Sequence, residues 1–529
     1  MKRLFESRIV LVCVVFGICT FMSACGGSTF NDPPGVASAA VASTQNPLVA
    51  QFTTKTALGC QGQVMVEFGP DTSYGRTTAW YPAPATLQST TILVAGMKAS
   101  TTYHMRAEGQ CPGNPTLFPS QDLTFTTGPL PKAAFPALTV SRPSPPPSSP
   151  ENAGVEMIDV TVANTPAFFT DRDGNVIWYY YMGTSGYAFP FKPLSNGHIV
   201  LNAVNPTIST LTEIDLAGNI IRQLSIVDLQ QKLQTAGFNL FPGGFHHDFM
   251  PLPNGHFLVL VDCNKSFTDL PGYPGTTSVQ GDAVVDLDQN WDPVWVWNAF
   301  DYLDVNRHLN GLPDWTHSNA LVYLPEDGNF LISMRHQSWV LKIDYNNGAG
   351  TGNVLWKLGY QGDFALTENG VPTQDPSPWF SFQHFPSLIG QNGPQTTLAI
   401  WDNGDGRVLN TNGEVCINPL LGNAFPACYS RATEFQIDES AMVANLTWAD
   451  QLPYFGIWGG SINQLANGNV EFDLNSPAIP PVSNGASEIR EVTQTANPQV
   501  IWQMDIPVPE FAYRAYRVPS LYPGVTWQF

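Results

Sequence analysis

From residue 155 to residue 529, one short pattern recurs along the chain: a turn that contains glycine, followed at once by an apolar strand. It is seen in DRDGNVIWYY, LSNGHIVLN, LAGNIIRQL, LPNGHFLVL, PEDGNFLIS and LANGNVEFD. Turns of this kind need a positive φ, which Gly and Asn adopt readily, and they join neighbouring antiparallel strands. The pattern therefore predicts a series of antiparallel hairpins and an all-β fold.

Two further patterns repeat in the same region. Strands end in aspartate in LTEIDLAG, AVVDLD, VLKIDYN and EFQIDES, and carry tryptophan in VIWYY, VWVWN, VLWKL and VIWQM. Recurring four-stranded units are typical of a β-propeller. Six blades would have roughly 62 residues each, which allows for loop insertions, and seven or eight blades of roughly 40–50 residues are the alternative. We expect a six-bladed β-propeller over residues 155–529.

The part of the chain before this region is composed differently. Residues 46–129 alternate apolar and polar positions in QVMVEFGP, STTILVAG, TTYHMRAEG and DLTFTTGPL. Short strands with a turn about every ten residues predict a small β-sandwich, which resembles a fibronectin type III domain. Residues 26–45 are small and polar, as in a tether, and residues 130–154 are rich in Pro and Ser, as in a linker.

The N-terminus has the composition of an export signal. Lys2, Arg3 and Arg8 surround the start of the apolar run IVLVCVVFGICTFMSA, and small residues precede Cys25. Residues 1–25 are therefore predicted to be a signal peptide. A cysteine at the first mature position resembles a bacterial lipoprotein signal, and plain cleavage nearby is the alternative. We expect an exported, periplasmic protein whose membrane contact is a lipid anchor on Cys25.

Export places the remaining cysteines in an oxidising compartment, where disulfides form. Cys60 and Cys111 lie in the predicted sandwich and are expected to pair. Cys416 and Cys428 bracket a loop and are also expected to pair. Cys263 is then left as a buried thiol, the common state of an unpaired cysteine.

The charge and the motifs exclude several classes of partner. The formal net charge of −20 makes nucleic acid an unsuitable ligand. No P-loop and no clear cluster of cation ligands is found, so neither a nucleotide cofactor nor a metal is expected. The segment WDNGDGR lacks the spaced acidic ligands of an EF-hand loop and is predicted to be a strand followed by a turn. The oligomeric state stays open.

Three histidines stand at equivalent places in the repeat. FHHDFMPLPNG contains His247, DWTHSNALVYLPEDG contains His317 and FSFQHFPSLIGQNG contains His384. Each precedes a turn glycine at the expected mouth of a strand, and the separations are close to one blade. Equivalent positions in successive blades point at the central axis of a propeller, so the three side chains are expected to converge.

Arg335, one strand after His317, adds a positive charge that needs a partner. Together with Asn319 it completes a predicted anion pocket that contains a nucleophile. The alternatives are three unrelated turn residues, or a zinc site made of three histidines; the guanidinium counts against a cation. His256 and His336 are interpreted as structural, and His246 is a partial exception because of its neighbour.

At this point the residues resemble a known family. HHD, DWTHSNAL, SMRHQSWVLKID, FQHFP, WDNGDGR and YRAYRVPSLYP together resemble the bacterial arylsulfate sulfotransferases that do not use PAPS, over roughly residues 155–529. The resemblance implies a six-bladed propeller beside a small β-sandwich. It also implies transfer of a sulfuryl group from a phenolic sulfate ester to a phenol through a sulfated histidine, without a cofactor.

Carried over residue by residue, the resemblance makes His384 the nucleophile. It makes His247, His317 and Arg335 the groups that hold the sulfate, with Asn319 beside them. HHD offers two histidines, and His247 is preferred because its spacing matches the other sites, with His246 as the second candidate for substrate binding.

Two other functions compete with this interpretation. One is a propeller without catalytic activity that binds an anionic aromatic compound or a glycan. The other is a hydrolase that uses the same His and Arg pocket, with or without a metal. A sulfatase proper would carry a C/S-x-P-x-R motif, which is absent from the sequence.

Overall fold

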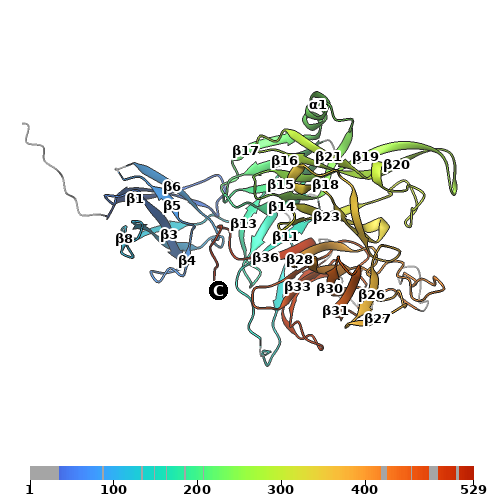
Figure 1. The fold of residues 1–529 in the computed structure, drawn as a ribbon. Coiled ribbons are helices and arrows are strands. Elements are labelled where there is room, and N and C mark those ends of the chain that lie inside the picture. The colour runs from blue at the N-terminus through green and yellow to red at the C-terminus, as the bar shows by residue number, and fades with distance from the viewer. Residues whose placement is uncertain are drawn as a thin grey trace, which may run out of the picture.

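The computed structural model describes residues 35–528 except 86–87, 133–134, 148, 163, 184–185, 206–207, 419–425, 454, 476–485 and 508–511. The predicted signal peptide and the lipidation of Cys25 lie outside these residues. Within them the chain is almost entirely β-structure in antiparallel sheets, which confirms the all-β prediction (Figure 1). No helix formed by the described residues has the length and apolar character needed to cross a membrane.

From residue 139 onward, the described chain forms six sheets of four or more strands. The first sheet contains β11 (Val155–Val160), β12 (Ala167–Thr170), β13 (Val176–Tyr180) and β36 (Ala512–Val518), and the second contains β14 (Tyr187–Pro193), β15 (Ile199–Asn205), β16 (Ile208–Ile214) and β17 (Ile220–Ser225). The third contains β18 (Pro242–Pro251), β19 (Phe257–Leu270), β20 (Tyr273–Leu287) and β21 (Pro293–Asn298), and the fourth contains β22 (Ser318–Leu324), β23 (Asn329–Met334), β24 (Trp339–Ile343) and β25 (Val354–Leu358). The fifth contains β26 (Ala365–Glu368), β27 (Val371–Pro372), β28 (His384–Asn392), β29 (Gln395–Asp402), β30 (Arg431–Asp438) and β31 (Val443–Gln451), and the sixth contains β10 (Thr139–Ser141), β32 (Ser461–Gln464), β33 (Val470–Leu474), β34 (Ala486–Val492) and β35 (Val500–Pro507).

The turn glycines behave as the sequence predicts. Each adopts a left-handed conformation with φ between 69° and 85°, at Gly174, Gly197, Gly218, Gly255, Gly328 and Gly468. An L side chain is strained in that conformation, so these positions fix where each hairpin turns. Short helical segments are α1 (Ile226–Ala236), α2 (Ala299–Tyr302), η1 (Arg335–Gln337) and η2 (Asn346–Gly348).

The six sheets contact one another in a closed circuit. β14 contacts β11 and β18, β22 contacts β18 and β28, and β32 contacts β28 and β36. β36 pairs with β11, so the last strand of the chain completes the first sheet. A cluster of buried apolar side chains lies between each sheet and the next.

The repeated tryptophans explain part of this arrangement. Nε1 of Trp178 in β13 donates to the backbone oxygen of Leu216 in the second sheet. In the same way, Trp502 in β35 donates to the backbone oxygen of Arg172 in the first sheet. A buried indole needs a partner for its N–H, and here the partner is a hairpin of the neighbouring sheet, so each bond joins two sheets.

The N-terminal part forms two further sheets, drawn in blue at one side of the larger body in Figure 1. One contains β1 (Gly35–Ser43), β2 (Ala50–Ala57) and β6 (Ser89–Val94); the other contains β3 (Gly62–Gly69), β4 (Arg76–Thr77), β5 (Tyr81–Ala83), β7 (Thr102–Gln110), β8 (Leu117–Pro119) and β9 (Leu123–Thr126). Their inner faces share buried apolar side chains such as Phe52 and Phe68. The predicted Cys60–Cys111 disulfide is present, and Cys263 is a buried free thiol, also as predicted.

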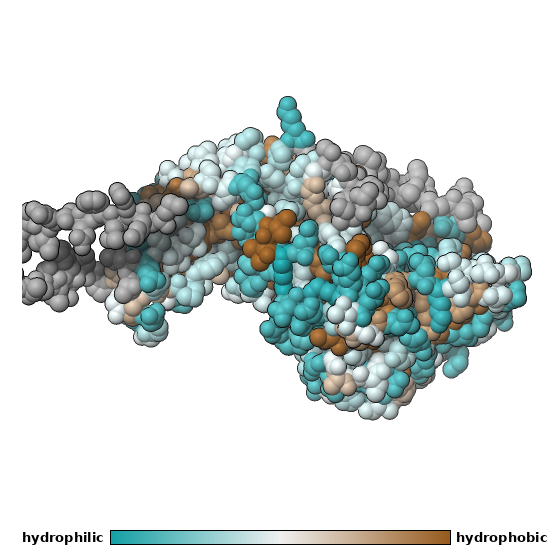
Figure 2. All heavy atoms as spheres, turned by 90° about the horizontal axis from the view of Figure 1, so that it is seen from above, coloured by the Kyte–Doolittle hydropathy of each residue, from teal (hydrophilic) through white to brown (hydrophobic). Residues whose placement is uncertain are grey.

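The C-terminal segment holds these sheets against the larger body. The hydroxyl of Tyr522 donates to the backbone oxygen of Leu93 at 2.7 Å. Nε1 of Trp527 donates to the backbone oxygen of Thr77 at 2.9 Å, and its ring packs edge-on against Phe68. Seen from above, the surface is largely hydrophilic with separate apolar patches (Figure 2), as expected of a folded protein whose sheets bury their apolar faces.

Two segments differ from the sequence-based expectation. Residues 35–43, expected in a tether, form β1 and pair with β2 because Val36 and Val41 pack on the apolar cluster of the N-terminal sheets. Residues 139–141, expected in a linker, form β10 and add an edge strand to β35. Composition alone did not show either pairing, since small and Pro-rich segments carry little periodicity.

Candidate active site

Three strands of neighbouring sheets bring the predicted histidines together. His317 directly precedes β22, and His384 is the first residue of β28. His247 lies inside β18 rather than at its start, within an irregularity of the β18–β19 register between Phe245 and Phe249. The rings of His247 and His317 are 4.8 Å apart between centroids. The rings of His247 and His384 each lie 5.7 Å from the ring of Tyr513 between centroids, so the three histidines converge as predicted. A bulge, and not a strand end, places His247 there.

His384 is almost fully buried and its ring is fixed on both sides. Oδ1 of Asn403 lies 2.7 Å from Nδ1 of His384. The Asn403 amide nitrogen donates to the backbone oxygens of Gly456 and Gly459, so Oδ1 must be the acceptor and Nδ1 carries the proton. The lone pair is left on Nε2, which the backbone N–H of Gly459 approaches to 3.2 Å.

The environment also keeps this imidazole neutral. Burial lowers the pKa of His384 well below its ordinary value, and the positive charge of Arg335 lowers it further. A neutral imidazole with an unprotonated ring nitrogen is a nucleophile near neutral pH. His384 therefore has the protonation state, the tautomer and the orientation that nucleophilic attack through Nε2 requires.

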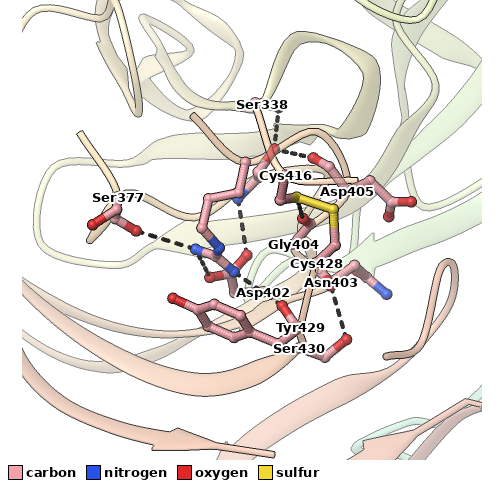
Figure 3. Close-up of a disulfide and its surroundings, with 12 residues drawn as sticks. Ser338, Ser377, Asp402, Asn403, Gly404, Asp405, Cys416, Cys428, Tyr429 and Ser430 are labelled. Carbon is pink, nitrogen blue, oxygen red and sulfur yellow. Dashed lines mark hydrogen bonds and ion pairs between the residues drawn. A yellow bond between two sulfur atoms is a disulfide. The ribbon is translucent and has the colours of Figure 1, made fainter. Parts of the chain in front are cut away.

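A disulfide lies beside the loop that carries Asn403. Cys416 and Cys428 are bonded, as predicted, and Figure 3 shows them next to Asn403, Gly404 and Asp405. Sγ of Cys416 is 3.3 Å from the backbone oxygen of Gly404, which adjoins Asn403. The segment WDNGDGR is thus a strand end and turn, as predicted, and it also supplies the partner of His384, which the sequence reasoning missed.

Strand pairing places Arg335 beside His317. Ser318 in β22 pairs with Met334 in β23, and the backbone N–H of Arg335 donates to the backbone oxygen of His317 at 3.2 Å. The Arg335 guanidinium lies 2.6 Å from Nε2 of His336 through one Nη atom and donates to the backbone oxygen of Ile457 through the other. Its Nε is buried and has no hydrogen-bond partner in the described part of the chain.

His317 forms a pair with Asp314. Its Nδ1 lies 2.7 Å from Oδ2 of Asp314, which leaves Nε2 as the reactive nitrogen. Asp314, His317 and His336 have ligand atoms within 4.8 Å of one another, a spacing that a metal ion could use. However, one nitrogen of His336 is occupied by Arg335 and the other lies 2.8 Å from the backbone oxygen of Asp314, so its lone pair is not free for a cation.

The two histidines of HHD face different partners. Nε2 of His246 lies 3.3 Å from Oδ1 of Asp282. Burial lowers the pKa of His246, but the hydrogen bond to Asp282 and its charge outweigh that effect and raise the pKa above its ordinary value. Burial and the neighbouring His317 instead lower the pKa of His247 well below its ordinary value. The neutral His247 ring therefore faces the other histidines, and His246 faces a carboxylate.

Asp248, the third residue of HHD, is buried and contacts residues of three other strands. Its Oδ1 lies 2.5 Å from Nζ of Lys192 and 3.2 Å from a guanidinium nitrogen of Arg514. Its Oδ2 accepts the backbone N–H of Leu321 in β22. Asp248 thus links β14, β18, β22 and β36 through one carboxylate. This network explains why an aspartate follows the two histidines, which the sequence did not reveal.

Asn319 and an aromatic group complete the site. The Asn319 side chain donates to the backbone oxygen of Gln383, and its Oδ1 is buried without a hydrogen-bond partner among the described residues. Tyr513 in β36 lies 5.7 Å from both His247 and His384 between ring centroids, and Phe189 packs on it at 4.4 Å. Tyr513 belongs to the segment YRAYRVPSLYP, in which no sequence pattern marks it as a site residue.

One protein family and several solved structures are similar to this chain. Residues 144–515 match the family model described as Arylsulfotransferase (ASST). No curated protein matches the chain. Three solved structures with weak similarity are a protein of unknown function from Bacteroides caccae (10% identity, 69% of this chain and 98% of that chain, TM-score 0.40), a protein from Lactobacillus plantarum (8%, 70% and 100%, 0.35) and a member of the duf4221 family from Bacteroides vulgatus (9%, 73% and 99%, 0.31). TM-scores this low do not establish a shared fold.

Proposed function

The chain belongs to the arylsulfotransferase family, and from this premise we propose that it moves a sulfuryl group from a phenolic sulfate ester to a phenol through a sulfohistidine at His384. No PAPS, other cofactor or metal takes part. The observation that carries the proposal is the contact of Asn403 with Nδ1 of His384, because it leaves the lone pair on Nε2.

In the first half-reaction, Nε2 of His384 attacks the sulfur and the bond between sulfur and the aryl oxygen breaks. The phenolate leaves and takes a proton from Nε2 of His317, the nitrogen that does not contact Asp314. By analogy with phosphoryl transfer, negative charge is spread over the sulfuryl oxygens in the transition state. Arg335 and His247 hold these oxygens, and the unpartnered Nε of Arg335 is one donor available for them.

In the second half-reaction a phenol replaces the departed one. Nε2 of the now neutral His317 takes the proton of the phenol, the phenol oxygen attacks sulfur, and the bond between sulfur and Nε2 of His384 breaks. The N–H of Gly459, which points at Nε2 in the free enzyme, is released when the sulfur bond forms and can then donate to a sulfuryl oxygen. Tyr513 and Phe189 are proposed to contact the aryl group.

The experiment is incubation with an aryl sulfate donor alone, followed by intact-mass analysis and peptide mapping after rapid quenching. One added sulfuryl group on His384 is expected, and it should disappear on addition of a phenol. His384→Ala should abolish both the adduct and the transfer, while His247→Ala and His317→Ala should slow both half-reactions. An adduct on another residue would overturn the assignment of the nucleophile.

The same experiment separates the competing functions. A hydrolase would release free sulfate without a phenol acceptor, and a metal-dependent one would lose activity with a chelator. The group formed by Asp314, His317 and His336 makes the chelator test worthwhile. A binding module would give neither an adduct nor turnover. We expect acceptor-dependent transfer that a chelator does not change.

We also propose that the six sheets are the blades of a six-bladed propeller, with the two N-terminal sheets as a β-sandwich beside it. The closed circuit of sheet contacts and the pairing of β36 with β11 support this proposal. Export to the periplasm and a lipid anchor on Cys25 remain proposals that rest on the N-terminal sequence. Labelling with a radioactive fatty acid, with Cys25→Ser as the control, tests the anchor.

A further inference from the structure

A cavity of about 320 Å³ lies next to the candidate active site. It lies between loops of the fourth and fifth sheets, and aromatic and aliphatic side chains form most of its walls. The lining includes Leu309, Tyr360, Trp379, Phe380, Phe382 and Val415. Ser338, which follows η1, also lines it, and η1 begins at Arg335. The same loop therefore borders both the cavity and the site.

Phe382 forms a wall shared by the cavity and the site. The Arg335 guanidinium carbon lies 5.1 Å from the centroid of the Phe382 ring, and the His336 ring is 5.7 Å from it. Phe382 holds this place with a left-handed backbone at φ 49°, where its N–H donates to Oγ of Ser338. One aromatic ring thus separates the cavity from the guanidinium proposed to hold the sulfuryl group.

The mouth of the cavity is apolar and open to solvent. Leu309 is 51% exposed and Val415 is 49% exposed, while Trp379 and Phe380 are buried behind them. An apolar entrance with buried aromatic walls fits a flat aromatic ring, because such sites bind mainly through apolar area. The volume exceeds what the six carbon atoms of a single ring would occupy, so a substituted ring can enter.

One cation in the lining is not neutralised. The Arg307 guanidinium stacks on Trp339, with its carbon 4.0 Å from the ring centroid. Its Nη atoms donate to the side chain of Gln361 and the backbone oxygen of Gln337, both of which are neutral. Its Nε is buried without a hydrogen-bond partner, and no carboxylate forms an ion pair with it within the described ranges. An anionic group on a bound molecule would supply the missing charge.

We propose that this cavity is a subsite for the second ring of an extended phenolic substrate that carries an acidic group. The proposal rests on the function proposed above: the phenol oxygen reacts at His384, and the second ring passes the edge of Phe382 into the cavity. The acidic substituent lies near Arg307. The preferred acceptors are thus acidic biaryl or polycyclic phenols rather than simple phenol.

The test compares three acceptors with one aryl sulfate donor: phenol, 4-phenylphenol and 4′-hydroxybiphenyl-4-carboxylate. In the wild type, kcat/KM should rise along this series, by about tenfold or more from the first to the last, because the second ring is buried and its carboxylate is paired. Val415→Trp and Leu309→Trp should fill the mouth and bring the ratio between the last and the first acceptor close to one. Activity toward phenol should not change.

Two controls make the outcome decisive. Ile220→Trp changes an exposed apolar residue in β17, remote from the cavity, and should keep the wild-type ratio. An unchanged ratio in both Val415→Trp and Leu309→Trp would overturn the subsite. If no acceptor were sulfated at all, the proposed function would fail, and calorimetric binding of the hydroxybiphenyl carboxylate to wild type and Val415→Trp would still decide the subsite: equal affinities, or no binding, would reject it.

Discussion

Oδ1 of Asn403 and Nδ1 of His384 lie 2.7 Å apart, although one residue directly follows the end of β29 and the other begins β28. β28 and β29 are paired, with His384 opposite Trp401, so the residue that follows the strand end faces back across the ladder. The Asn403 amide is itself fixed by two backbone oxygens. This chain of bonds decides which nitrogen of His384 is free.

Asn403→Ala tests that relationship. The change leaves Nδ1 of His384 without its acceptor, so both tautomers are populated and the ring is less well oriented. We expect the rate of donor cleavage in a single turnover to fall by about tenfold or more, which corresponds to about 1.4 kcal/mol. The binding constant of the donor should change much less than this rate. A full-rate burst of phenol release in Asn403→Ala would contradict a role in orienting the nucleophile.

Arg335→Lys tests whether binding of the sulfuryl group requires the planar guanidinium group of arginine. Lysine keeps the positive charge but lacks the donors at fixed angles that match the oxygens of a sulfuryl group. We expect transfer to fall by about tenfold or more, again about 1.4 kcal/mol of lost transition-state binding. Steady-state kcat/KM with one donor and one acceptor measures it. A wild-type value would make Arg335 a structural residue that only supports His336 and Phe382.

Asp248→Asn tests the buried network beneath the histidines. Without the carboxylate, Lys192 and Arg514 are buried cations that have lost their shared partner. Breaking a buried ion pair in this way costs about 3–5 kcal/mol of unfolding free energy. Urea denaturation followed by tryptophan fluorescence measures the loss. Asp292→Asn, which removes an exposed ion pair with Lys232, should cost less than about 1 kcal/mol.

The Cys416–Cys428 disulfide should stabilise the loop beside the site. It closes a separation of 12 residues, and the chain-entropy model gives about 3 kcal/mol for a loop of that size. The double variant Cys416→Ala/Cys428→Ala should lose about that much unfolding free energy and should also transfer more slowly, because Gly404 loses its contact with the Cys416 sulfur. The matched change at Cys60 and Cys111 should destabilise the protein without slowing the transfer.

The pKa of His384 predicts how donor cleavage depends on pH. Because burial holds this pKa well below the ordinary value, the imidazole stays neutral as the pH falls through the range in which a free histidine is protonated. The single-turnover rate of donor cleavage should therefore not decline as the pH falls from about pH 8 to about pH 5.5. In Asn403→Asp the added carboxylate favours the imidazolium, so the decline should begin at a higher pH. A wild-type rate of donor cleavage that declines at low pH with a midpoint near the pKa of a free histidine would reject this prediction.

The local structure and the repeat can be predicted from residues that are close together along the chain. The turn glycines and the alternation of apolar residues act over a few positions, because a left-handed turn and a half-buried strand are both set by neighbouring residues. For this reason the hairpins, the equivalent places of His247, His317 and His384, and the position of Arg335 beside His317 could all be predicted. The two disulfides followed from export and from the spacing of the cysteines.

The partners of these residues, by contrast, depend on how the chain folds in three dimensions. Asn403 orients His384, Asp248 joins Lys192 to Arg514, and a bulge turns His247 toward the site while its neighbour faces a carboxylate. The partners of Asp248 come from different sheets, and the bond between Asn403 and His384 crosses a hairpin ladder, so no pattern along the chain encodes either contact. The contacts of Asp248 arise because strands of different sheets meet, and the contact of Asn403 with His384 arises because β28 pairs with β29.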